Sequence, residues 1–363
     1  MIESNQFQAL LLKSLVEGCF SHQTRNTDWM RFGGRLKSYF KDFASTAFAR
    51  FRMTRTDHSR AALNFVLEHL SSFERAYYLL ADDFSRALLV KLVTFKILGS
   101  KHVKLPLNTP QYWKTYHSID RDYCRKKQTA VAWNRHWSLN RYEIPSPNGT
   151  ISLDAHPLTV LATYFLQQYA YQKSKTPVSV RPGDVVIDGG GCWGDTALYF
   201  ADQAGENGKV VSFEFLGENT AIFASNLRLN PKLGSRIQLV EEALWNASDQ
   251  TLSFDDNGPG TKVGTVGAKA VRTVAIDDFV VKQKLPRIDF IKLDIEGAEL
   301  QALQGASQTL KTFRPRLAVA LYHKPDDILM IPAWLDGLGL GYRFYLDHFT
   351  IHAEETVLFA TAA

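Results

Sequence analysis

A group of glycines between residues 188 and 196 is the strongest chemical signal in the sequence. The segment VVIDGGGCWGDTALYFA contains a short apolar run, then Asp188, then four glycines, and a helical pattern begins near Asp195 or Thr196. Glycine lets a backbone turn sharply against a ligand, and a helix N-terminus offers free N–H groups and a positive dipole end. We therefore predict a strand, a ligand-binding turn and a helix that could receive a carboxylate or phosphate.

A carboxylate ends the next strand that we predict, over 209–215. Glu214 stands at its C-terminal end in the segment KVVSFEF, where it can accept hydrogen bonds from two ribose hydroxyls. Gly189, Gly191 and Gly194 also satisfy the dinucleotide pattern G-x-G-x-x-G,. Enzymes that use NAD and enzymes that use S-adenosylmethionine share both features. The two segments indicate adenosine binding without choosing between these cofactors.

A second acidic cluster favours one of them. The segment IDFIKLDIEGAELQALQGA contains a strongly apolar strand pattern followed by Asp294, Glu296 and Glu299. Ligands of open parallel sheets bind beyond the carboxyl ends of the strands, so Asp188, Glu214 and Asp294 are expected to converge on one cleft. A sulfonium cofactor with an ammonium group suits this negative charge better than nicotinamide does. We therefore favour S-adenosylmethionine and keep an NAD-dependent oxidoreductase as the alternative.

Three residues are candidates for removing a proton from an acceptor. His323 follows the predicted strand 316–322, and an imidazole can take a proton near neutral pH,. Its rivals are Lys292, which would need a lowered pKa, and Asp294, which the cofactor could occupy. Asp294, Glu296 and His323 also carry donor atoms that suit a divalent metal, but their spacing is not diagnostic. We predict no metal site from the sequence.

Two further segments could contribute to the same cleft. Glu242 and Ala243 lie at the end of the predicted strand 237–244, where an acid could accept from the adenine amine or simply face solvent. The polar, glycine-rich loop over 255–267 could be a lid over the acceptor or a plain hairpin loop,.

These residues need a doubly wound α/β domain to position them. Short apolar runs over 184–189, 209–215, 237–244, 289–295 and 316–322 alternate with helical segments, which predicts a mostly parallel Rossmann-like sheet,. The runs 342–349 and 355–362 predict a closing pair with an antiparallel strand. Residues 1–145 are expected to form a mainly helical region that shapes the acceptor site or a homodimer interface. The turn-rich segment IPSPNGT over 144–150 marks the expected boundary with the domain over 146–363,.

Together these segments resemble the FkbM family of methyltransferases. The resemblance covers 178–363 and is carried by DGGGCWGDT, SFEFLGENTAIFASNL, DFIKLDIEGAEL and ETVLFA. The segment AYYLLADDFSRALL over 76–89 resembles an N-terminal extension that some members carry. The resemblance implies an S-adenosylmethionine-dependent O-methyltransferase with a doubly wound catalytic domain. Its acceptors would be hydroxyl groups of sugars, glycans or natural products.

The family motifs fall on definite positions of this sequence. The glycine loop corresponds to Asp188, Gly190 and Gly194, the ribose acid to Glu214, and the late motif to Lys292, Asp294, Glu296 and Gly297. The chain departs from the family pattern at Cys192 and Trp193 in the loop, and at Phe215, where a proline commonly follows the ribose acid. The predicted cofactor-binding residues are Asp188, Gly190, Cys192, Gly194, Asp195, Thr196, Glu214, Glu242, Ala243 and Asp294.

Composition and charge exclude several other classes. The chain has 363 residues, 45% of them hydrophobic, and three distant cysteines that give no metal spacing,. No secretory signal or continuous apolar span is evident, so we expect a cytoplasmic protein without a membrane span. The formal net charge is +5, and no nucleic-acid motif accompanies it,. We interpret the basic residues as a solvated helix face: Arg121, Arg125, Lys126, Lys127, Arg135 and Arg141,.

Overall fold

The computed structural model describes residues 5–21, 49–132, 137–175, 177–256, 260–264 and 266–362, with side chains from 59 onward in the second range. Two compact units divide the chain: residues 1–110 with 346–356, and residues 111–345 with 357–363. No helix among the described residues is both long and apolar enough to cross a membrane.

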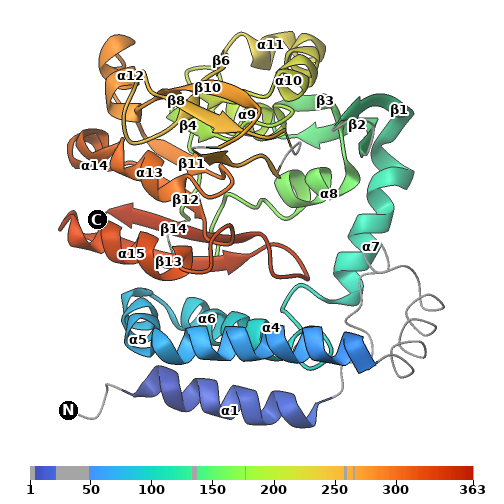
Figure 1. Ribbon diagram of the computed structural model, residues 1–363. Helices are drawn as coiled ribbons and strands as arrows, with labels where there is room; N and C mark the ends of the chain where they lie inside the picture. The colour runs from blue at the N-terminus through green and yellow to red at the C-terminus, as the bar shows by residue number, and fades with distance from the viewer. Residues whose placement is uncertain are drawn as a thin grey trace. The chain divides into compact units, whose positions relative to one another are not determined.

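The first unit is helical, as the sequence predicts (Figure 1). Asp82 caps the N-terminus of its most buried helix, since its carboxylate accepts the Ser85 N–H at 2.8 Å,. Gly99 ends the same helix with a φ of 77°,. Phe7 and Phe73 stack with ring centroids 5.8 Å apart and bind two helices together. The helices are α1 (Gln6–Phe20), α4 (Ala49–Glu68), α5 (Leu70–Leu79) and α6 (Asp83–Leu98).

A seven-stranded sheet forms the centre of the second unit and confirms the predicted doubly wound fold. The strand order is β13-β14-β12-β11-β4-β5-β6, in which the last five strands are parallel and β14 is antiparallel to β12. Every predicted strand of this sheet is present. The strands are β4 (Val185–Gly189), β5 (Lys209–Phe213), β6 (Ile237–Val240), β11 (Phe290–Leu293), β12 (Arg316–Ala320), β13 (Tyr342–His348) and β14 (Thr356–Ala362).

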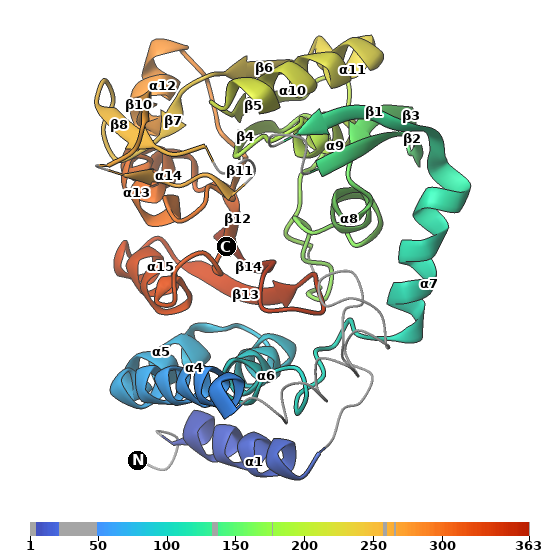
Figure 2. The ribbon, with the colours of Figure 1, turned by 45° about the vertical axis from the view of Figure 1, so that its right-hand side comes forward.

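Helices cover both faces of this sheet. Figure 2 shows α9 on one side of β4 and β11, with α13 and α14 on the opposite side. Strands that are covered on both faces read as continuous apolar runs, which is why β4, β11 and β12 were recognisable in the sequence. The helices are α9 (Asp195–Ala204), α10 (Gly217–Leu229), α11 (Pro231–Gly234), α12 (Ile276–Lys282), α13 (Glu299–Gln304), α14 (Ser307–Phe313) and α15 (Asp327–Gly337).

The segment between the helical unit and the central sheet differs from the expected helical region. After α7 (Pro110–Ser118) and a π-helical turn over Ile119–Tyr123, the chain forms an antiparallel sheet of β1 (Cys124–Ala132), β2 (Trp137–Ser146) and β3 (Gly149–Ala155). The turn signal at 144–150 closes the β2–β3 hairpin, where Ser146 pairs with Gly149. The compact units therefore divide at Pro110 rather than at 145.

Four of the basic residues lie on this small sheet (Arg125, Lys126, Lys127 and Arg141) and Arg121 lies on the π-helical turn before it, so the helix-face interpretation was wrong. β1 is exposed along most of its length and lacks the apolar alternation that marks a strand, which hid it in the sequence,. Most of the basic side chains pair with acids: Arg121 with Asp122 at 2.6 Å, Arg125 with Glu143 at 3.0 Å, Lys127 with Asp120 at 2.7 Å, and Arg141 with Asp154 at 2.6 Å. Arg135 lies outside the described residues.

Two further groups of elements complete the second unit. A helical segment follows β3 as α8 (Pro157–Val160) and a π-helical turn over Leu161–Phe165. A second small sheet, in the order β7-β10-β8-β9, lies between β6 and α12 and was not predicted. Its strands are β7 (Ala243–Leu244), β8 (Thr251–Phe254), β9 (Val263–Gly264) and β10 (Lys269–Val274).

The cap of α8 predicts a pH dependence of stability. The His156 Nδ1 accepts the Leu158 N–H at 3.3 Å, and the ring lies 4.7 Å from that of Trp137. Burial lowers the pKa of His156 to about 4, although Asp120 opposes this effect. The unfolded chain therefore binds the proton more readily, and stability falls as the pH drops from about 6.5 through 4.

We expect this loss to be on the order of 1–3 kcal/mol. His156→Asn keeps a capping side chain but does not titrate. Chemical denaturation of both proteins between pH 7 and pH 4 measures the difference. Parallel losses of unfolding free energy in the two proteins would show that His156 does not contribute.

Candidate active site

The glycine loop connects β4 to α9, as predicted. Gly190 has a φ of +82°, and a Cβ atom there would lie 2.0 Å from the carbonyl oxygen of Asp294. Gly194 also has a φ of +82° and is the N-cap of α9. The loop needs glycine at 190 because the backbone passes directly against the residue that follows β11.

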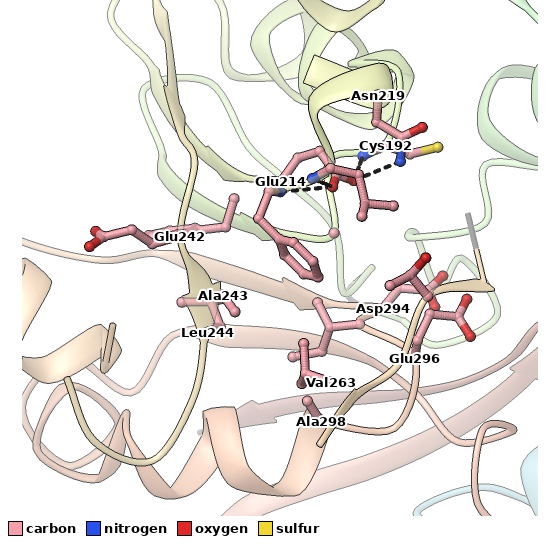
Figure 3. Close-up of a pocket in the computed structure, with 16 residues that line it drawn as sticks. Cys192, Glu214, Asn219, Glu242, Ala243, Leu244, Val263, Asp294, Glu296 and Ala298 are labelled. Atoms are coloured by element: carbon pink, nitrogen blue, oxygen red, sulfur yellow. Dashed lines mark hydrogen bonds between the residues drawn. The ribbon is translucent and has the colours of Figure 1, made fainter. Parts of the chain in front are cut away.

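Glu214 holds the loop and the following turn together. Its Oε1 accepts the N–H groups of Phe215 and Leu216, both at 2.8 Å. Its Oε2 accepts the Cys192 N–H at 3.0 Å and the Asn219 side-chain amide at 3.3 Å. Burial raises the pKa of Glu214, and these hydrogen bonds oppose that effect. Figure 3 shows the carboxylate between Cys192 and Asn219.

Trp193, one of the departures from the family pattern, does not line the site. Its side chain is buried against Ala132, Leu139 and Ile222. Its Nε1–H donates to the Oδ1 of Asn219 at 3.1 Å. The indole thus orients the Asn219 amide that donates to Glu214. Trp193 therefore contributes to the site indirectly, through Asn219.

A pocket with an empty volume of about 590 Å³ opens beside Glu214 (Figure 3). In Figure 3 the Glu242 carboxylate lies at one end, Glu214 in the middle, and Asp294 and Glu296 at the other end. The predicted cofactor residues that line it are Gly190, Cys192, Glu214, Glu242, Ala243 and Asp294.

Apolar side chains complete the walls. Phe215 lines the pocket and packs edge-on against Phe254 at 5.1 Å between ring centroids. Leu216 and Ala243 belong to the same buried cluster, and Val263 packs against it. The phenylalanine at the position of the usual proline therefore adds a flat apolar surface to this wall.

Four predicted cofactor residues lie outside the pocket lining: Asp188, Gly194, Asp195 and Thr196. Asp188 is fully buried and accepts hydrogen bonds from Ser212 at 2.7 Å and Thr196 at 3.0 Å. The Asp195 carboxylate accepts the Thr163 hydroxyl at 3.1 Å, and burial raises its pKa to about 6. The side chains of Asp188, Asp195 and Thr196 stabilise the base of the loop.

Lys292 holds the backbone of the same glycine loop by hydrogen bonds. Its Nζ donates to the carbonyl oxygens of Gly189 at 2.9 Å and Gly190 at 2.7 Å. It also pairs with Asp188 at 3.2 Å, where both side chains are almost completely buried. Burial lowers the pKa of Lys292, but the neighbouring carboxylates outweigh this effect and raise it. Lys292 is therefore a charged support and does not have the lowered pKa that a base would need.

Asp294 has a fixed, ionised carboxylate at the pocket wall. The Tyr169 hydroxyl donates to its Oδ2 at 2.6 Å, and the Tyr322 hydroxyl donates to its Oδ1 at 3.0 Å. Burial raises the pKa of Asp294, but His323, Lys292 and the two tyrosines together lower it. Asp294 is thus a hydrogen-bond acceptor of low basicity.

His323 lies against three carboxylates. Its Nδ1 is 2.8 Å from Glu299 Oε1, and its Nε2 is 3.4 Å from both Asp294 Oδ1 and Glu296 Oε1. Burial lowers the pKa of His323, but Glu296, Glu299 and Asp294 raise it to about 11. With this set of neighbours the imidazole is protonated at neutral pH, which argues against the predicted role of general base.

Comparison with known proteins identifies the domain. Residues 178–344 match the methyltransferase FkbM domain. This part of the chain is an FkbM methyltransferase domain. The match confirms the predicted resemblance to FkbM methyltransferases over these residues.

Two other proteins are similar to parts of this chain. The crystal structure of methyltransferase FkbM from Methylobacillus flagellatus KT superposes with a TM-score of 0.52 and 20% identity, over 82% of this chain and 60% of that one. Hexuronic acid methyltransferase AglP of Haloferax volcanii is 31% identical over 71 residues, which is 18% of this chain and 30% of that protein. The chain thus matches less than two thirds of either relative. Neither supports the alternative of an NAD-dependent oxidoreductase.

Sequence reasoning missed several residues that line the pocket of the FkbM domain. Asn219 stands five positions after Glu214 in the first turn of α10, and that proximity was the available signal. Thr261 and Val263 come from the predicted lid loop 255–267, part of which lies outside the described residues. Val263 belongs to β9, which pairs with β8, and lid movement stays a prediction.

The contact between Trp193 and Asn219 predicts a measurable effect on the FkbM domain. Trp193→Phe removes the indole donor and leaves a buried amide oxygen without it, which costs about 1–3 kcal/mol of unfolding free energy. Because Asn219 is then free to turn away from Glu214, we expect about two- to tenfold weaker cofactor binding, or up to about 1.4 kcal/mol. Denaturation and calorimetry measure the two effects.

Trp137→Phe is the matched control, because Trp137 packs against Trp193 at 5.9 Å without making this hydrogen bond. We expect it to keep its cofactor affinity. Equal affinities of the two variants would contradict a role for the indole donor.

Proposed function

We propose that this protein transfers a methyl group from S-adenosylmethionine to a hydroxyl group of a sugar, glycan or natural product. The observation that carries the proposal is the chemistry of the pocket wall. Glu214, Glu242, Asp294 and Glu296 line the pocket, whereas no lysine or arginine belongs to its described lining. Such a wall favours a cofactor with cationic sulfonium and ammonium groups over one with phosphates.

The order of the residues along the pocket fits the parts of this cofactor. Glu214 would accept the ribose hydroxyls on its Oε2 side, where the contact with Asn219 is the longest of its four hydrogen bonds at 3.3 Å. Phe215, Leu216 and Val263 would cover the adenine, with Glu242 at its outer edge. The close approach of Gly190 to Asp294 leaves room for no side chain there. When bound, the cofactor supplies an activated methyl group.

The acceptor would lie at the end of the pocket near Asp294 and Glu296. Tyr169 and Tyr322 hold the Asp294 carboxylate in place, so it can accept a hydrogen bond from an acceptor hydroxyl and orient its oxygen. Alignment of the acceptor oxygen with the methyl group is the main task of the protein in such a reaction. We assign to Lys292 and His323 the support of this end of the site.

The acidic wall also bears on the class of acceptor. A hexuronic acid, the substrate class in the name of AglP, offers both hydroxyls and a carboxylate. A hydroxyl can donate a hydrogen bond to Asp294 or Glu296, whereas an acceptor carboxylate has no hydrogen to donate. The acidic wall therefore favours methylation of a hydroxyl.

Transfer of a labelled methyl group from S-adenosylmethionine into extracts of the source cells tests the proposal. We expect label in a sugar-containing fraction that survives mild alkali, because methyl ethers resist hydrolysis and methyl esters do not. Label that is lost in mild alkali would overturn methylation of a hydroxyl. At subsaturating S-adenosylmethionine, Glu214→Ala should reduce incorporation by about ten- to a hundredfold, and the exposed Glu218→Ala on α10 is the matched control.

A further inference from the structure

The carboxylates around His323 form a compact group of donor atoms. One donor atom from each of Asp294, Glu299 and His323 lies within 4.8 Å of the others. The imidazole is oriented by Glu299, whose Oε1 lies 2.8 Å from Nδ1. The same Oε1 accepts the N–H groups of Ile295 at 2.8 Å and Gly297 at 3.3 Å, so Glu299 cannot easily move. The ring therefore directs Nε2 toward the remaining two carboxylates.

The atoms that face this group lack hydrogen-bond partners. Among the described residues, the buried Nε2 of His323 and the buried Oε2 of Glu299 make no hydrogen bond. The His323 side chain is 4% exposed and that of Glu299 is 0% exposed. The Nε2 is 3.4 Å from the nearest oxygens of Asp294 and Glu296, longer than an ordinary N–H···O hydrogen bond of 2.7–3.2 Å,. Buried polar atoms nearly always have a partner, so these two atoms are candidates for contact with a bound ion.

The arrangement matches a known pattern of metal coordination. Histidine ligands usually donate their second ring N–H to a carboxylate, which fixes the tautomer and orients the coordinating nitrogen. Glu299 occupies that position here, and Asp294 and Glu296 supply oxygen atoms beside Nε2. One imidazole with carboxylate oxygens suits divalent cations such as Mn²⁺ or Mg²⁺.

We propose that Asp294, Glu296 and the Nε2 of His323 bind a divalent cation, which displaces the Nε2 proton to solvent, and that Glu299 orients His323 for this purpose. The spacing of these residues is not diagnostic in the sequence, and the structure brings them together from the loop after β11 and the loop after β12. Asp294 and Glu296 also line the pocket, so the cation would be accessible from it.

The consequence for catalysis rests on the proposed function. A divalent cation at the acceptor end of the pocket would bind the acceptor oxygen and lower the pKa of its hydroxyl. The hydroxyl proton would leave to solvent, the C–S bond to the methyl group would break, and the new C–O bond would form. Binding of the cation itself requires neither the cofactor nor the acceptor, so it can be tested separately.

The test is titration of the full chain with Mn²⁺ alone, after removal of bound metals, by electron paramagnetic resonance of the free ion. We expect saturable binding of one Mn²⁺ per chain in the absence of cofactor. His323→Gln and Glu296→Gln should each weaken it about tenfold or more, the size of effect seen for changes at and around metal ligands. Glu296 is partly exposed, so its variant should fold even if the other does not.

Asp326→Asn is the matched control, since it removes an exposed carboxylate three positions after His323. It should leave Mn²⁺ affinity unchanged. Absence of saturable binding, or equal affinity in Glu296→Gln and the unchanged protein, would overturn the proposal and leave His323 as a buried cation. Calorimetry with S-adenosylmethionine on the same proteins separates this result from a failure of the proposed function. Loss of Mn²⁺ binding with retained cofactor binding supports the metal site.

Discussion

Glu214→Ala is expected to weaken S-adenosylmethionine binding by ten- to a hundredfold. The substitution removes the carboxylate that we assign to the ribose hydroxyls, and charge-assisted hydrogen bonds of this kind contribute about 1.5–3 kcal/mol. It also leaves the N–H groups of Cys192, Phe215 and Leu216 without their acceptor, so the loop and the turn lose their common anchor. Isothermal titration calorimetry on the folded variant measures the change.

Glu218→Ala provides the comparison, because this carboxylate is exposed in the first turn of α10. Its affinity should equal that of the unchanged protein. The Glu214 variant must also show cooperative thermal unfolding before its affinity is interpreted. If it binds the cofactor normally, the ribose is held elsewhere and Glu214 only stabilises the loop.

Lys292→Met is expected to lower the unfolding free energy by about 3–5 kcal/mol. Removal of one partner from a buried ion pair leaves the other charge without compensation. Here the partner is Asp188, which is fully buried and 3.2 Å from Nζ. The substitution also removes the donors to the carbonyl oxygens of Gly189 and Gly190. Urea denaturation with linear extrapolation gives the value.

The double variant Asp188→Asn with Lys292→Met separates charge from packing. Asparagine can still accept from the Ser212 or Thr196 hydroxyl without requiring a counter-charge,. We expect it to recover a large part of the lost stability. A double variant no more stable than Lys292→Met would show that the lost contacts to the loop, and not the charge of Asp188, dominate the effect.

The sequence was sufficient for the central fold because its strands are covered on both faces. β4, β11 and β12 are mostly apolar, with one charged residue in each (Asp188, Lys292 and Arg316), and glycines mark the turn that follows β4,. β1 could not be recognised in this way. It is an edge strand with Arg125, Lys126 and Lys127 in succession, and register shifts interrupt its pairing with β2.

The same reasoning located the site but not the direction of each side chain. Ends of parallel strands meet at one edge, which brought Glu214 and Asp294 to one pocket as expected. In the parallel register of β11 and β4, Lys292 lies opposite Asp188. Their side chains form an ion pair at the base of the glycine loop. That register, which places Asp188 in a buried ion pair with Lys292, has no signature in the local sequence.

The raised pKa of His323 could not be predicted from the sequence either. Position after β12 placed it near the cleft, and an isolated imidazole there would titrate near neutral pH. The structure adds Glu299, which approaches Nδ1 from the start of α13. A carboxylate that lies 24 positions away in the chain thus changes the chemistry expected of this residue.

The hairpin that closes at Ser146 and Gly149 determines where a shortened protein can begin. Residues 140–146 of β2 pair with 149–155 of β3 along the whole length of β3. A protein that started at 150 would expose this edge of β3, and an unpaired edge is a template for association with other chains. One that started at 111 would retain all three strands. The second starting point is therefore the better choice for producing the catalytic domain in concentrated solution.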